Sequence, residues 1–187
     1  AAPGAGGGGP GLPRRGPALR VPSPPPMGCD ATPLLNALQQ EALRSGDRDA
    51  LARALVAALK GSFPQASWAG IYWLQGQELV LGPYLGPPTE HQRIPVGVGV
   101  CGTAVSEDKD QLVTDVRERA NYLACSSSVR SEIVVLIRAR GQVVGQLDLD
   151  SERVGGFSGD DACVLKAVAD AFGGLLAALP ASHAARA

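Results

Sequence analysis

The chain has 187 residues, a length that fits one domain. Its 17 Lys and Arg residues balance its 18 Asp and Glu residues, which argues against nucleic acid as the main partner, because a phosphate backbone requires clustered positive charge. No apolar run approaches the roughly 20 residues of a membrane span, so we expect no membrane partner. The four cysteines form no Cys-x-x-Cys pair and no signal peptide is visible, which favours a cytoplasmic location.

The first 30 residues differ in composition from the rest of the chain. Ala1 to Met27 is almost entirely Gly, Pro, Ala and Arg, and such a segment buries too little apolar surface to offset its ordering entropy. We therefore expect residues 1–30 to be a disordered extension, 31–180 to form the domain and 181–187 to be a loose tail. Cys29 lies at the boundary and has no evident role.

Two helices are predicted at the start of the domain. The first begins at Thr32 as N-cap, with Pro33 after it, and ends at Gly46. The second is capped by Asp47 and ends before Gly61, and its leucines recur on one face.

A hairpin follows, with strands over 67–74 and 79–84 joined by a glycine-containing turn. A loop then runs to Arg93, and a glycine-rich turn leads into a short helix that begins near Cys101. Residues 112–116 are predicted to form a short strand.

The last third of the chain starts with a polar, irregular segment over 117–129. Two strands over 132–138 and 143–150 form a second hairpin. A capping box at Ser158 begins the final helix, which Pro180 ends.

These elements predict an α+β fold. Hairpins imply an antiparallel sheet, and helices at both ends of the chain imply a helical layer on one of its faces. The loops 85–110 and 117–130 are left to cover the other face. Each of these loops contains a cysteine, so we expect the pocket to lie where they meet.

Cys101 and Cys125 are the candidate reactive thiols. Cys101 is predicted near a helix N-terminus, where the unpaired N–H groups and the dipole favour a thiolate; the alternative is a small buried residue in a tight turn. Cys125 lies in a polar, serine-rich loop, with a stray surface thiol as its alternative interpretation. Cys163 sits beside the apolar stripe of the last helix, which predicts packing.

Three carboxylates interrupt otherwise apolar strands. Strand alternation puts Asp148 and Asp150 on one face, together with Val144. A two-residue turn before this strand would place Glu132 opposite Leu149, and a three-residue loop would place it opposite Asp150. We favour the second register, because it gathers the acids into a cluster that can bind a cation or donate a proton. The alternative is a solvated outer face.

Trp68 and Tyr72 share one face of their strand. They form either hydrophobic core or an aromatic wall for a small apolar group or a cation. A zinc site built from His91, Cys101 and Cys125 matches no standard ligand spacing and lacks a fourth ligand, so we expect no metal.

At these residues the sequence resembles the free methionine-(R)-sulfoxide reductases, which are single GAF domains. The similarity runs from about residue 34 to about residue 179. The segments that carry it are Ser67–Tyr72, Leu81–Tyr84, Ile94–Ala104, Ala124–Cys125, Ser131–Val134 and Gly145–Ser151.

The resemblance implies the reduction of free L-methionine-(R)-sulfoxide without a bound cofactor. A cysteine thiolate attacks the sulfoxide sulfur, an acid protonates its oxygen, and a second cysteine condenses with the resulting sulfenic acid to form a disulfide. Thioredoxin, which is kept reduced by electrons from NADPH, reduces that disulfide. Such an activity implies a role in the response to oxidative stress. The oligomeric state is left open, with a homodimer as one option.

The resemblance also implies roles for single residues. Cys125 matches the family cysteine usually given the attacking role, and Cys101 matches another proposed attacker. Glu132, Asp148 and Asp150 match the acids that hold the ammonium and sulfoxide groups. Trp68 and Tyr72 would flank the methyl end of the substrate.

One departure concerns His91, which occupies the position of a third cysteine in typical members. The usual partner of Cys125 is therefore absent. Cys101 or an external thiol would have to resolve the sulfenic acid. The alternative function is a GAF domain that binds a small ligand or senses redox state without catalysis.

Overall fold

The computed structural model describes residues 29–119 and 127–179 and confirms the α+β class. Its elements, in chain order, are α1 (Thr32–Arg44), α2 (Arg48–Ser62), β1 (Trp68–Gln75), β2 (Glu78–Leu85), β3 (Arg93–Pro95), α3 (Gly99–Ser106), β4 (Gln111–Val113), the 3₁₀ turn η1 (Val116–Glu118), β5 (Ser131–Ala139), β6 (Gln142–Ser151) and α4 (Gly159–Ala178). The expected extension, apart from Cys29 and Asp30, and the expected tail lie outside the described residues.

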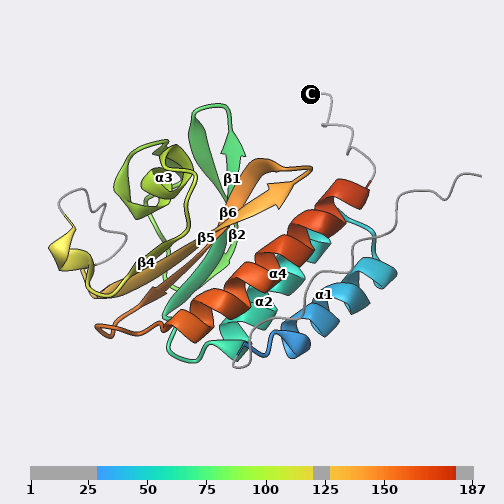
Figure 1. The fold of residues 1–187 in the computed structure, drawn as a ribbon, viewed down its shortest axis with the longest axis horizontal. Helices are drawn as coiled ribbons and strands as arrows, with labels where there is room; N and C mark the ends of the chain where they lie inside the picture. Colours follow the sequence, from blue (N-terminus) through green and yellow to red (C-terminus); the bar gives the residue numbers. More distant parts are fainter. Residues whose placement is uncertain (1–28, 120–126, 180–187) are drawn as a thin grey trace, which may run out of the picture.

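One antiparallel sheet, in the order β3-β2-β1-β6-β5-β4, separates two layers. Helices α1, α2 and α4 pack on one face, as predicted, and α3 lies on the other with the loops (Figure 1). Leu55, Leu165 and Phe172 belong to the buried core on the helical face. No helix in the described part of the chain is long and apolar enough to cross a membrane.

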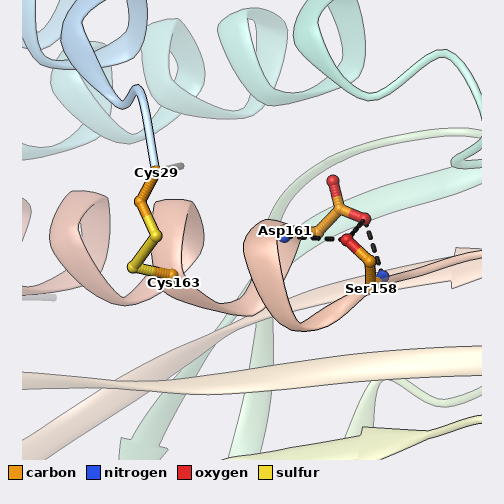
Figure 2. Close-up of a disulfide and its surroundings, with 4 residues drawn as sticks. All are labelled: Cys29, Ser158, Asp161 and Cys163. Carbon is orange, nitrogen blue, oxygen red and sulfur yellow. Dashed lines mark hydrogen bonds between the residues drawn. A yellow bond between two sulfur atoms is a disulfide. The ribbon is translucent and has the colours of Figure 1, made fainter. Parts of the chain in front are cut away.

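The helix starts agree with the sequence in two cases and differ in one. Asp47 caps α2 by accepting a hydrogen bond from the Ala50 N–H at 2.8 Å. Ser158 and Asp161 form the predicted capping box of α4, drawn in Figure 2. Thr32, predicted as the N-cap of α1, is instead its first residue, and its N–H is bound by the Asp30 carboxylate.

The register of the β5–β6 hairpin has an unexpected cause. The turn has two residues, Arg140 and Gly141, both with positive φ, which alone would place Glu132 opposite Leu149. Glu132 nevertheless lies opposite Asp150, because the register shifts by one residue between Ile137 and Arg138.

A β-bulge at Val144 produces this shift, because one extra residue on β6 moves all later pairs by one position. The predicted register of the acids is therefore confirmed, but the three-residue loop offered as its cause is wrong. The predicted faces of Val143 and Val144 are also wrong. Val144 packs with the helical core, and Val143 packs on the opposite face.

Two further differences concern short strands. β3 pairs with β2 where the sequence predicted only loop, and its central residue, Ile94, is buried. β4 begins at Gln111 and ends at Val113, earlier than the predicted 112–116 strand. Strands this short carry too few residues for a clear alternation.

A disulfide joins Cys29 to Cys163, with 5.8 Å between the two Cα atoms (Figure 2). Cys29 had no evident role in the sequence and Cys163 was predicted to pack, and both interpretations are corrected by this bond. It ties the segment just before α1 to the first half of α4. The spacing of 134 residues gives no local pattern from which the pair could have been predicted.

Candidate functional site

The three carboxylates meet on the sheet face opposite α1, α2 and α4. Asp150 of β6 lies between Trp68 of β1 and Glu132 of β5, as their cross-strand partner. Asp148 lies two residues earlier on the same face, opposite Gly70. All three carboxylates are at most 3% exposed, so the alternative of a solvated outer face does not apply.

Cys101 lies in the first turn of α3, as predicted, and its thiol points at the acids. The sulfur donates to Asp148 Oδ2 at 3.2 Å and to Glu132 Oε1 at 3.8 Å. The residue is 3% exposed. Cys101 is therefore a buried side chain, as the alternative interpretation held, and it lies at the acid cluster, a contact that the sequence analysis did not predict.

Burial is the largest cause of the raised pKa values of the three acids. It raises the pKa of Asp148 to about 7, against an ordinary value of 3.8. Burial, followed by the charges of Asp148 and Asp150, raises the pKa of Glu132 well above its usual range. Burial and the Asp148 charge do the same for the pKa of Asp150. The cluster therefore holds protons near neutral pH and can act as an acid.

A raised carboxylate pKa makes the substrate-free protein less stable at high pH. The contribution of Asp148 to stability is complete below its ordinary pKa of 3.8 and is lost as pH rises through about 7. A difference of this size corresponds to at most about 4 kcal/mol. Urea denaturation should show the Asp148→Asn variant gaining up to that amount over the parent between about pH 4 and pH 8. A difference that stays constant with pH would contradict the raised pKa.

An aromatic wall adjoins the acids. The Trp68 ring stacks on Tyr84 with centroids 5.4 Å apart and on Tyr72 at 6.2 Å. Gly70 makes room for it, since a Cβ there would lie 2.3 Å from the Trp68 ring. Tyr84 was missed as a member of this wall, because its place on β2 becomes apparent only from the pairing with β1.

A pocket opens between this wall and two of the acids, Asp148 and Asp150. Residues from β1, β6 and both loops surround it: Ser67, Trp68, Tyr72, Pro87, Pro88, Thr89, Ser128, Val129, Asp148, Asp150 and Glu152. The predicted meeting of the two loops over the sheet is therefore confirmed. Tyr72 fixes the first loop by donating its hydroxyl to the His91 carbonyl at 2.9 Å.

Cys125 lies outside the described residues. His91 contacts the site through its backbone carbonyl, which accepts the hydrogen bond from the Tyr72 hydroxyl. The zinc set considered from the sequence includes Cys125 and so lies partly outside the described residues. Among the described residues, Cys101, Glu132 and Asp148 place three potential ligand atoms within 4.8 Å of one another.

Comparison with known proteins shows which family this chain belongs to. The GAF domain family model matches residues 45–177. Free methionine-R-sulfoxide reductase of Neisseria meningitidis, solved with its substrate, is 35% identical, with a TM-score of 0.71 over 76% of this chain and 85% of that one. The reduced form of fRMsr of Staphylococcus aureus is 34% identical, with a TM-score of 0.73 over 79% of this chain and 96% of that one. This chain belongs to the free methionine-R-sulfoxide reductase family of GAF domains.

A protein from Escherichia coli is also similar to this chain in sequence. That free methionine-R-sulfoxide reductase is 43% identical over 51% of this chain and 57% of its own length. The resemblance proposed from the sequence is confirmed, and so is the GAF fold. In this fold Trp68, Asp148 and Asp150 line one pocket, and the Cys101 thiol lies beside Asp148.

Proposed function

We propose that the protein reduces free L-methionine-(R)-sulfoxide to methionine. The observation that carries the proposal is the set of three buried carboxylates beside the Cys101 thiol, two of which, Asp148 and Asp150, line a pocket with an aromatic wall. Within the described residues, no ion pair neutralises any of the three. These carboxylates suit a small ligand that carries both an ammonium group and an oxygen to be protonated.

The residues that line the pocket support a small amino acid as the ligand. The ammonium would bind the carboxylates, and Trp68 and Tyr72 would contact the methylthio end. The Trp68 indole N–H is buried and has no hydrogen-bond partner among the described residues, so it is available to a substrate oxygen.

The proposed chemistry balances in three steps. Cys125 attacks the sulfoxide sulfur as a thiolate while a protonated carboxyl group of the cluster donates its proton to the oxygen. The hydroxyl then passes from that sulfur to the Cys125 sulfur as the S–O bond and the new S–S bond break, which leaves methionine and a cysteine sulfenic acid. A second thiol displaces water from the sulfenic acid and forms a disulfide. A dithiol such as thioredoxin then exchanges with that disulfide, taking over the oxidation and regenerating both thiols.

The contacts of Cys101 favour Cys125 as the attacking residue. The Cys101 thiol donates to Asp148, and a thiolate there would face carboxylates at 3.2 and 3.8 Å, where like charges repel. Cys101 is then the residue that resolves the sulfenic acid, in place of the cysteine that His91 replaces.

The cellular compartment of the protein determines which reductant is available to it. We propose the thioredoxin system of the cytoplasm as the electron source. The Cys29–Cys163 disulfide makes an oxidising compartment the competing location, because such bonds persist where thiols are not kept reduced.

The test is NADPH consumption with thioredoxin, thioredoxin reductase and the (R) epimer of free methionine sulfoxide, with the (S) epimer as control. We expect turnover on the (R) epimer alone. Cys125→Ser should abolish it, and Cys101→Ser should accumulate a sulfenic acid at Cys125 that a dimedone-type probe traps. Full turnover by Cys125→Ser would refute the assignment of the two cysteines.

His91 in the cysteine position favours a second candidate function, a GAF domain that binds a small ligand without turning it over. This function predicts tight binding of a small molecule by calorimetry and no turnover in the parent protein, even with dithiothreitol. Turnover by the parent would exclude it.

A further inference from the structure

We propose that Cys101, Glu132 and Asp148 bind a thiophilic divalent cation of the zinc class, and that this cation reversibly blocks the pocket. Binding of the cation stands on the geometry alone. Inhibition of turnover rests on the proposed function, since the same groups would serve methionine sulfoxide.

The distances between the ligand atoms suit zinc. Zinc binds thiolate sulfur at about 2.3 Å and carboxylate oxygen at about 2.0–2.2 Å, so a tetrahedral ion holds sulfur and oxygen about 3.6 Å apart. Cys101 Sγ lies 3.2 Å from Asp148 Oδ2 and 3.8 Å from Glu132 Oε1, on either side of that value. All three ligand atoms lie within 4.8 Å of one another. Small side-chain shifts would complete the three protein ligands of an open zinc site.

Unpartnered oxygens give a second reason to expect a cation. Asp148 Oδ1 and Asp150 Oδ1 are buried and make no hydrogen bond in the described part of the chain. Both carboxylates line the same pocket. A buried acceptor without a partner is destabilising, and a bound cation removes that cost. Arg119, whose charge acts on Glu132, forms no ion pair with any of the three acids in the described structure.

The donor set decides which cations are expected. One sulfur and two carboxylates suit Zn²⁺, Cd²⁺ and Co²⁺, whereas Ca²⁺ and Mg²⁺ require six or more oxygen ligands, many of them from water. The pocket that reaches Asp148 supplies the entry path and leaves the fourth position to water or to Asp150. On binding, the Cys101 S–H bond is replaced by a sulfur–metal bond and the proton leaves to solvent.

Cobalt(II) is the probe for the binding test, because a thiolate–cobalt bond gives a charge-transfer absorption band. The metal-free full chain, with its Cys29–Cys163 disulfide intact, is titrated with Co²⁺ and then with Zn²⁺. We expect a band that saturates at one equivalent, that Zn²⁺ removes and that a hundredfold excess of Ca²⁺ leaves in place.

Variants locate the site. Cys101→Ser should lose the band and Cys125→Ser should keep it, which makes the second cysteine the matched control. Asp148→Asn should weaken Co²⁺ binding by at least about tenfold while its thermal unfolding stays cooperative. A band that survives in Cys101→Ser, or one that Ca²⁺ abolishes, would overturn the proposal.

Activity is measured separately. Zn²⁺ should suppress turnover of the metal-free enzyme, a chelator should restore it, and rising substrate concentration should weaken the inhibition. Zn²⁺ that binds without lowering turnover would refute the block but not the site. If the metal-free protein shows no turnover, the proposed function fails, and the cobalt band still decides whether the cation binds.

Discussion

The Asp148→Asn variant should lower kcat/KM for free L-methionine-(R)-sulfoxide by about 10²–10⁴-fold, the usual contribution of a positioned general acid. Asp148 accepts a hydrogen bond from the Cys101 thiol, lines the pocket and has a pKa raised to about 7, so it can hold a proton and give it to the sulfoxide oxygen. Asparagine keeps the shape and loses the acid. Steady-state assays with a dithiol reductant measure the change.

Two comparisons separate loss of the acid from damage to the fold. Asp160→Asn, at an exposed position in the first turn of α4, provides a charge-neutralising control and should retain full turnover. Asp148→Asn should unfold at the same or a higher temperature near neutral pH, because it removes a buried charge. Turnover within about threefold of the parent would remove Asp148 from the mechanism and leave Glu132 or Asp150 as the acid.

Replacing both Cys29 and Cys163 by Ser should lower the free energy of unfolding by about 3–5 kcal/mol. The two residues are 134 positions apart, so the bond constrains nearly the whole domain in the unfolded state. Urea denaturation monitored by tryptophan fluorescence gives the value. Turnover at low temperature should be unaffected, because the bond joins the start of the domain to α4 on the helical side of the sheet (Figure 2), whereas the acids lie on the other face beside Cys101 of α3.

Dithiothreitol supplies the control for this comparison. It should destabilise the parent by about the same amount and leave the Cys29→Ser/Cys163→Ser variant unchanged. A variant as stable as the oxidised parent would show that the bond makes no net contribution, as happens when the reduced, unfolded chain keeps structure of its own.

Much of the fold followed from local chemistry. Asp47 and Ser158 were recognisable as caps because a short polar side chain precedes an apolar periodic run. The strands were recognisable from aromatic and β-branched residues. The acids of β6 stood out because a carboxylate in an apolar strand requires a partner or a function.

The remainder depends on contacts between distant segments. Neither β3 nor the Cys29–Cys163 bond leaves a local signal, since each depends on a partner elsewhere in the chain. The same holds for Tyr84, which becomes part of the aromatic wall only through strand pairing. The role of Cys125 rests on family resemblance, because it lies outside the described residues.

The extra residue at Val144 separates the length of the β5–β6 turn from the position of the acids. Deleting Val144 should remove the bulge and leave Glu132 opposite Asp150, because Arg138–Val143 and Ile137–Gly145 then become consecutive pairs of a regular ladder. The bulge is therefore a position at which the hairpin can lose one residue without moving the acids.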